Sequence, residues 1–243
     1  MRFSIRHEFK YTYDSPVRLS TQYLRLVPRD TTRQKVLAWK LDTPSPALAT
    51  TDGYGNVLHV LTIDKPAAEI AIVAAGAVET SPAQDEPSDF TGVPLPPLVF
   101  LRPTGLTRPN EALAAFAEKF RNLGETLPKL RGLAQTVRER NPEGSAADVV
   151  HTFIGCCRHL GVPARYVSGY FYAAGVAMHA WAEAWVDGRW RSFDVARGKP
   201  VGEAHIKIAV GADYLDACPV RGVRVGGGTE TLEAAAHVEA GQQ

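Results

Sequence analysis

The sequence has little of what marks a secreted, membrane-spanning or nucleic-acid-binding chain. It holds three cysteines, too few for a disulfide framework, so we expect the reducing cytoplasm. Its longest apolar run, residues 70–78, is far short of the roughly 20 residues of a membrane helix. The N-terminus is charged and alternating, with no apolar signal core. Basic residues number 27 against 26 acidic ones, which indicates neither nucleic acid nor membrane as a partner.

What is present fits a globular protein with a β-rich first part. The 243 residues are 45% apolar and 22% charged, which suits one large domain or two small ones. Over residues 1–80, apolar and polar residues alternate in short runs separated by turn signals, such as the break at Ser15-Pro16. This pattern predicts an N-terminal β-domain, a small β-sandwich.

The second part changes period. Residues 81–109 begin with a proline-rich stretch and are expected to be a linker. Helical spacing then covers residues 110–120, 127–140 and 146–160, and alternation returns in 165–172, 180–186 and 190–195. Segregated helices and strands predict an α+β core over residues 110–225. The tail, residues 226–243, is glycine-rich and then helix-like, so we expect it to be frayed.

The candidate chemistry lies on two of these strands. His179 opens one strand and Asp194 lies in the next, with the hairpin turn Asp187-Gly188 between them. Such strands pair antiparallel and place the two residues near each other, allowing for a stagger. An aspartate that accepts from an imidazole N–H fixes its tautomer, which is the base-and-orienter half of a nucleophilic triad. Unrelated surface residues are the alternative.

Four segments resemble the bacterial transglutaminase-like family with an N-terminal β-domain. They are residues 18–29 (RLSTQYLRLVPR), 52–56 (DGYGN), 161–170 (GVPARYVSGY) and 179–186 (HAWAEAWV). Asp213-Tyr214 and residues 219–222 (PVRG) are similar to the family's usual ending. The resemblance implies a papain-like core, with a cysteine at a helix N-terminus, His179 as general base and Asp194 as its orienter.

The sequence departs from that family at the nucleophile. The family pattern is Gly-x-Cys, with an aspartate two residues after the cysteine and a histidine three residues further on. Here Gly144, Asp148 and His151 keep this register, but Ala146 occupies the cysteine position. Only residues 141–143 remain where relatives usually carry a loop and a further helix. An alanine methyl group cannot attack a carbonyl, so acyl transfer is expected to be lost.

Neighbouring residues offer no ready replacement. Ser145 would point elsewhere by about 100° and is better explained as a helix N-cap supported by Asp148. Cys156 and Cys157 lie ten and eleven residues beyond Ala146, about 15 Å further along the helix. Helix cysteines are more often small buried hydrophobes. A different hydrolase reaction through either cysteine stays open.

No metal and no cofactor is expected. Four residues with zinc-ligand chemistry lie close in sequence, but without Cys-x-x-Cys or His-x-x-x-His spacing: His151, Cys156, Cys157 and His159. His151 fits a core histidine better. Trp181 shares a strand face with His179 and fits sheet packing better than a ligand platform.

The sequence thus predicts a cysteine-peptidase or amidase type of protein with an impaired site. His179 and Asp194 are kept, Ala146 replaces the nucleophile, and the ligand is a protein or peptide. The alternative is a non-catalytic module that binds peptides or serves as a scaffold.

Overall fold

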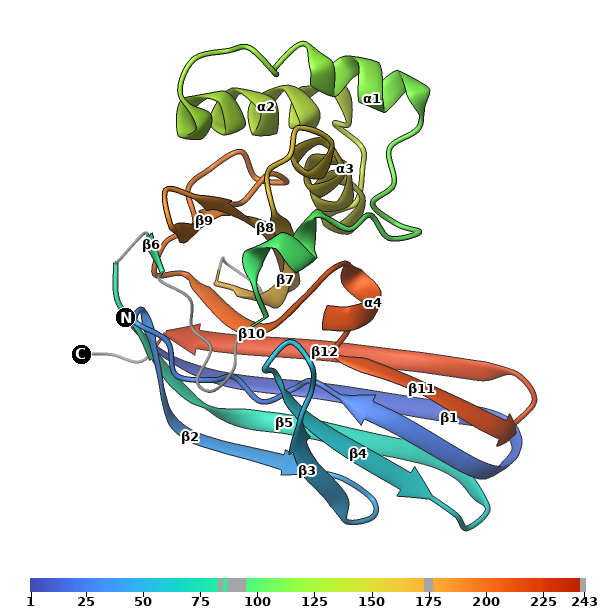
Figure 1. Cartoon of the computed structure of the whole chain (residues 1–243). Helices are drawn as coiled ribbons and strands as arrows, with labels where there is room; N and C mark the ends of the chain where they lie inside the picture. The colour runs from blue at the N-terminus through green and yellow to red at the C-terminus, as the bar shows by residue number, and fades with distance from the viewer. Residues whose placement is uncertain (83–84, 87–94, 173–176, 241–243) are drawn as a thin grey trace.

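The computed structural model describes residues 1–82, 85–86, 95–172 and 177–240, and it contains two antiparallel sheets (Figure 1). The first sheet has seven strands in the described part of the chain. They are β1 (Arg2–Leu24), β2 (Gln34–Asp42), β3 (Ala47–Thr51), β4 (Val57–Ile63), β5 (Ala67–Thr80), β11 (Val220–Gly226) and β12 (Glu230–Ala240). The α+β class is confirmed, and the strands expected as a small sandwich form one curled sheet.

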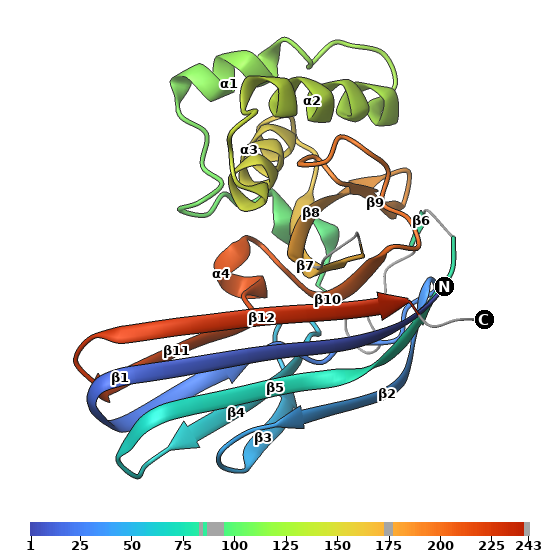
Figure 2. The same ribbon diagram turned by 180° about the vertical axis from the view of Figure 1, so that it is seen from behind.

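The long strand β1 organises this sheet, as Figure 2 shows from behind. Its first half lies between β5 and β12, and its second half lies between β4 and β11. Ser15-Pro16 does not end the strand as predicted. The chain instead shifts its register with β5 between Thr12 and Val17 and continues. A bulge of this kind bends a strand without breaking it, so one strand serves both halves of the sheet.

The prediction of a helix-like, frayed tail is wrong. Residues 230–240 form β12, which pairs with β1 from Phe3↔Ala240 to Tyr13↔Glu230. Three consecutive glycines with positive φ, at positions 226–228, form the turn from β11 into β12. The alanine-rich sequence reads as helical by propensity, but the unpaired edge of β1 offers it a full ladder of backbone hydrogen bonds. Strands β11 and β12, on either side of the domain boundary expected at residue 225, therefore both belong to the first sheet.

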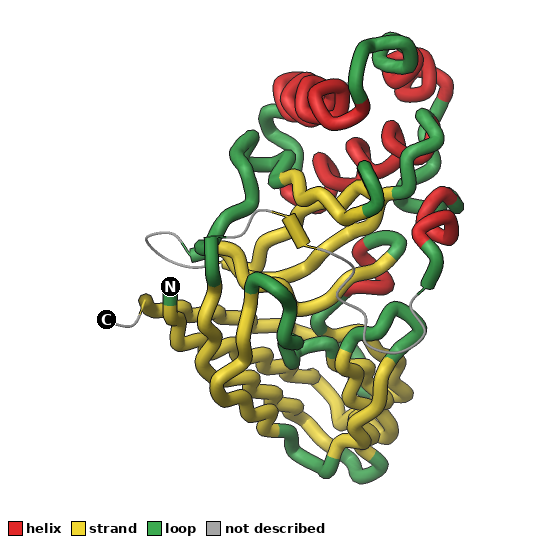
Figure 3. The backbone as a smooth tube through the Cα atoms, turned by 60° about the vertical axis from the view of Figure 1, so that its left-hand side comes forward, coloured by secondary structure: helices red, strands yellow, loops and turns green. Residues whose placement is uncertain are grey.

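The second sheet has the strand order β10-β7-β8-β9-β6, and helices α1 to α3 cover the face turned away from the first sheet (Figures 1 and 3). The elements are β6 (Asp85–Glu86), η1 (Pro97–Leu101), α1 (Glu111–Glu118), α2 (Thr126–Arg140), α3 (Ala146–His159), β7 (Ala164–Phe171), β8 (Ala177–Val186), β9 (Arg189–Phe193), β10 (His205–Gly211) and α4 (Tyr214–Ala217). The three long helices and strands β7 to β9 were predicted, whereas β10 was missed. No helix in the described ranges has the length and apolar character needed to cross a membrane.

Local signals explain where these elements begin and turn. The Asn110 side chain accepts from the Leu113 N–H and starts α1, and Ser145 accepts from the Asp148 N–H and starts α3. Asp187 and Gly188 both have positive φ, as a two-residue hairpin of the primed type requires. The N-cap prediction for Ser145 is confirmed.

Part of the expected linker, residues 81–109, is packed rather than free. Phe100 of η1 is fully buried, and its ring meets that of Trp190 edge-on at 5.3 Å between centroids. The backbone of β6 pairs with β9. The rest of the proline-rich stretch, residues 83–84 and 87–94, lies outside the described residues.

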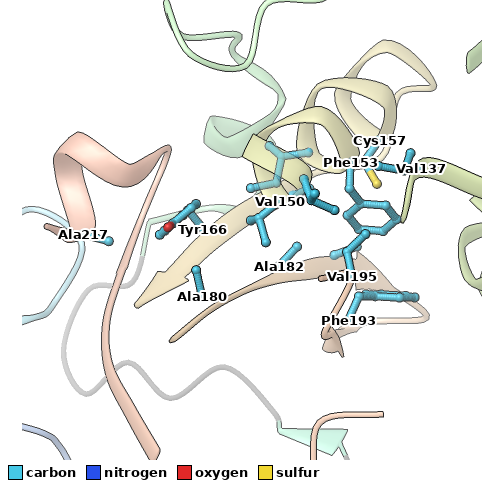
Figure 4. Close-up of a cluster of buried hydrophobic side chains, with 14 of the residues drawn as sticks. Val137, Val150, Phe153, Cys157, Tyr166, Ala180, Ala182, Phe193, Val195 and Ala217 are labelled. Carbon is cyan, nitrogen blue, oxygen red and sulfur yellow. The ribbon is translucent and has the colours of Figure 1, made fainter. Parts of the chain in front are cut away.

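The core of the second half lies between α3 and the sheet. Figure 4 shows Val150 and Phe153 of α3 facing Ala182 of β8 and Phe193 of β9. Small side chains on β8 let the helix approach closely, because Ala180, Ala182 and Ala184 alternate on the covered face. This packing holds the start of α3 and the strands β8 and β9 in fixed relation.

Side chains of the first sheet and its loops pair with the open edge of β10. The Gln34 amide donates to the Lys207 carbonyl at 2.9 Å and accepts from its N–H at 2.8 Å. The Asn56 amide does the same with Val210, at 2.7 and 2.8 Å. Arg33, 3% exposed, donates to the carbonyl of His205 at 2.9 Å. Buried backbone groups need such partners, so the two halves of the chain are joined by hydrogen bonds as well as by apolar contact.

If β12 is integral to the fold, an aspartate in place of Val238 lowers the free energy of unfolding by about 2–4 kcal/mol. Val238 is 6% exposed and lies in the apolar core that the two sheets share. Leu232 lies on the same strand at 49% exposure, so Leu232→Asp changes stability by less than about 1 kcal/mol. Urea unfolding followed by tryptophan fluorescence measures both. Equal stabilities for the two variants would contradict a buried role for the C-terminal end of β12.

Candidate active site

The two predicted residues lie together in the second sheet. His179 is on β8, and Asp194 directly follows β9. The His179 Nε2 atom lies 2.9 Å from Asp194 Oδ2, although the contact is not a well-aligned hydrogen bond. Asp194 is 2% exposed. With Nε2 directed to the carboxylate, Nδ1 is the imidazole nitrogen left to serve a second group, as in a base-and-orienter pair.

A third residue, His205, belongs to this site and was missed. His205 opens β10, and its Nε2 atom lies 3.0 Å from the same Asp194 Oδ2. Its Nδ1 accepts a hydrogen bond from the Gly202 N–H at 3.1 Å. Because an acceptor Nδ1 requires the proton on Nε2, His205 donates to Asp194. The sequence contains one signal for this strand. Residues 205–211 (HIKIAVG) begin with a histidine and continue with an alternating pattern, as the strand that begins at His179 does.

The carboxylate of Asp194 is held ionised. Burial alone would raise its pKa, but the contacts with His179 and His205 and the Arg197 N–H at 3.1 Å outweigh burial, so the pKa lies well below its usual range. Burial lowers the pKa of His205, against the pull of Asp194, so this ring stays neutral near pH 7. The Arg197 guanidinium lies over the Phe171 ring, 3.7 Å from its centroid, and adds a positive charge beside the site.

Ala146, which is expected from the sequence to occupy the nucleophile position, is the first residue of helix α3. Ala146 follows Ser145, whose Oγ lies 2.7 Å from Asp148 Oδ2 and also caps the helix. A helix N-terminus lowers the pKa of a thiol placed there, but the alanine methyl group has no proton or lone pair to use. Ser145 is committed to the cap.

The cysteines are not placed for nucleophilic chemistry. Cys156 and Cys157 are fully buried, and burial raises the pKa of Cys156 to about 12 and that of Cys157 well above its usual value. Cys218 is also buried, with its sulfur 3.0 Å from the Val220 carbonyl oxygen. Reactive cysteines have depressed pKa values and some exposure, so these thiols fit packing.

The other residues that the sequence singled out have structural partners. His151 is buried, stacks on Tyr166 and accepts from the Tyr214 N–H at 3.1 Å. His159 instead pairs with Glu118 at 2.7 Å, away from the cysteines. Trp181 is fully buried and meets the His205 ring edge-on at 5.4 Å between centroids. These contacts favour packing over a zinc site or a ligand platform.

One set of residues in the described ranges has the donor atoms for a metal ion. The ligand atoms of His179, Asp194 and His205 lie within 4.8 Å of one another. A metal on His205 Nε2 would require the proton to move to Nδ1, which already faces the Gly202 N–H. The donor set therefore fits a hydrogen-bonded cluster better than a metal centre.

A cleft of about 490 Å³ adjoins this site, between α2 and residues 198–201. Arg138 of α2 reaches across one end and donates to the Ala196 carbonyl at 3.0 Å. The lining of the cleft includes Phe193 and Asp194 at the end of β9.

Comparison with known proteins identifies this arrangement. Residues 103–195 match the transglutaminase-like superfamily, and residues 3–79 match the bacterial transglutaminase-like N-terminal region. The chain superposes on the "Putative Cysteine Protease" of Cytophaga hutchinsonii with a TM-score of 0.76 at 22% identity, over 98% of this chain and 89% of that one. The core thus has a cysteine-peptidase-like fold.

Two relatives match this chain over nearly its whole length. An uncharacterized protein of Mycobacterium leprae is 27% identical over 96% of both chains, and one of Mycobacterium bovis is 29% identical over 91% of this chain and 87% of its own. The chain belongs to the bacterial transglutaminase-like proteins.

If Asp194 is the charged centre of the site, Asp194→Asn lowers the free energy of unfolding by about 1–3 kcal/mol at pH 7, because it weakens three donor contacts. A depressed carboxyl pKa stabilises the fold above the unfolded-state pKa of about 3.9, and this contribution is lost as the pH falls through the folded-state pKa. The difference in free energy of unfolding between wild type and Asp194→Asn therefore becomes smaller below about pH 4. Urea unfolding across this pH range measures it.

Asp187→Asn is the matched control, since Asp187 is exposed in a turn whose positive φ suits asparagine. Its effect stays within about 0.5 kcal/mol. An Asp194→Asn protein as stable as wild type at pH 7 would contradict the role given to the carboxylate.

Proposed function

We propose that this protein is a transglutaminase-like member of the cysteine-peptidase or amidase type whose acyl-transfer chemistry is disabled. The observation that carries the proposal is that Ala146 is the first residue of α3, in a chain whose His179 and Asp194 are paired at 2.9 Å. Loss of the nucleophile from a serine-protease triad costs about 10⁶ in rate. No other nucleophile in the described residues is free to replace it at this position.

The framework that remains suits ligand binding. A peptide or another amide-bearing molecule is the ligand that such a groove would hold, and the cleft beside Asp194 supports this choice. A non-catalytic module that binds peptides is therefore the natural role that we assign. A hydrolase that uses Cys156 or Cys157 is disfavoured, since both thiols are buried and their pKa values are raised.

The proposal predicts that Ala146→Cys restores a reactive thiol. The new sulfur would sit at a helix N-terminus near a histidine, so its pKa falls below the usual value of about 8.5. Iodoacetamide labelling of the variant against pH measures this pKa, and background is low because the three native cysteines are buried. Wild type is expected to cleave no peptide amide, whereas Ala146→Cys is expected to show measurable turnover.

Two variants control this experiment. Ser145→Cys places a thiol one residue away, on a different side of the same helix N-terminus. The helix still lowers the pKa of this thiol, but without the histidine the pKa is expected to fall less than in Ala146→Cys. Ala146→Cys combined with His179→Ala is expected to have a higher thiol pKa than Ala146→Cys alone, because only the helix N-terminus then lowers it. If Ala146→Cys and Ser145→Cys label identically, the histidine does not serve this position. Amide cleavage by the unmodified chain would contradict the loss of chemistry.

A further inference from the structure

The cleft beside Asp194 is lined on one side by an outward face of α2. Leu127, Arg131, Ala134, Gln135 and Arg138 recur at the spacing of one helix face, while Leu130, Leu133 and Val137 of the same helix are buried in the core. The opposite wall is the short segment 198–201, and the end of β9 forms the floor. Figure 1 shows α2 lying over β9.

The lining carries an excess of positive charge. Arg131, Arg138, Arg191 and Lys199 line the cleft, against Glu139 and Asp194. The carboxylate of Asp194 is faced by the Arg197 guanidinium at 3.5 Å and accepts from His205, and Glu139 accepts from the Gln135 amide at 2.9 Å. No carboxylate of the described residues forms an ion pair with Arg131 or Lys199. The net charge of the whole chain is only +1, so this concentration is local.

The same walls also carry apolar side chains. Leu127 on α2, Phe193 on the floor and Val201 on the opposite wall contribute to the lining. A volume of about 490 Å³ is within the range of pockets that bury a drug-sized molecule, so the cleft would hold part of a peptide chain. An inorganic anion would fill a small part of this space and leave the apolar part uncovered.

We propose that the cleft binds acidic peptides, with carboxylate side chains paired to Arg131 and Lys199 and the intervening chain on the apolar floor. This proposal rests on the proposed function, whose peptide ligand it specifies. Arginine pairs with carboxylates through two parallel hydrogen bonds, which gives orientation as well as attraction. Lysine supplies a point charge on the facing wall.

The test is isothermal titration calorimetry of the full chain with hexaglutamate, hexaglutamine, glutarate and inorganic phosphate. Hexaglutamate is expected to bind most tightly and to weaken as salt rises. The Arg131→Glu and Lys199→Glu double variant is expected to lose at least about tenfold in affinity for hexaglutamate. Both residues are exposed, so melting curves of the variant should match wild type.

Arg189→Glu is the matched control. Arg189 is exposed on β9 but does not line the cleft, and its reversal is expected to change affinity by less than about twofold. A milder pair, Arg131→Gln with Lys199→Gln, removes the charges without reversing them and should give an intermediate loss.

The remaining outcomes separate this inference from the proposed function. Equal binding of hexaglutamine and hexaglutamate, unaffected by the charge variants, would overturn acidic recognition and leave peptide binding standing. Phosphate or glutarate binding as tightly as hexaglutamate would overturn the peptide and make the site one for small anions. If no peptide binds at all, both proposals fail.

Discussion

An ionised carboxylate removed from water is the constraint on which this site depends. Asp194 is 2% exposed, and a buried charge without partners is too costly to keep. Its partners come from three separate places in the chain: His179 on β8, His205 on β10 and the backbone N–H of Arg197 in the loop after β9. Each must be held within about 3 Å of the carboxylate. The relative positions of β8, β9 and β10 are therefore tied to the satisfaction of one side chain.

This requirement extends into the first sheet. His205 can reach Asp194 only if the start of β10 stays in place, and Arg33 holds that start by donating to the carbonyls of Gly202 and His205. Gln34 and Asn56 then pair with the backbone further along β10, whose outer edge has no neighbouring strand among the described residues. Because side-chain amides complete the sheet edge, the N-terminal sheet supports the site although it contributes no residue to it.

The sequence was informative where signals are local. The cap at Ser145 and the turn at Asp187-Gly188 could be predicted because each depends on residues at most four apart, and the turn places His179 near Asp194. The strand β12 and the role of His205 were not readable. An alanine-rich segment becomes a strand only when the edge of β1, more than 200 positions earlier, is available. His205 lies on β10, which is separated from β8 by β7. Its contact with Asp194 therefore cannot be predicted from the spacing of residues along the chain.

The presence of His179 and Asp194 in a chain with Ala146 at the start of α3 has a structural explanation that requires no catalysis. An alanine at the start of α3 leaves the Ser145 cap intact, and its methyl group leaves no polar group without a hydrogen-bond partner. Loss of Asp194 would instead leave His205 and the Arg197 N–H without their acceptor in a buried place, which is costly. The positions of His179 and Asp194 are therefore fixed by stability, whichever residue stands at position 146. Arg131 and Lys199 differ from His179 and Asp194, because no ion pair within the described part of the chain gives them a structural role. The cleft is therefore a better place to test for function than His179 and Asp194 are.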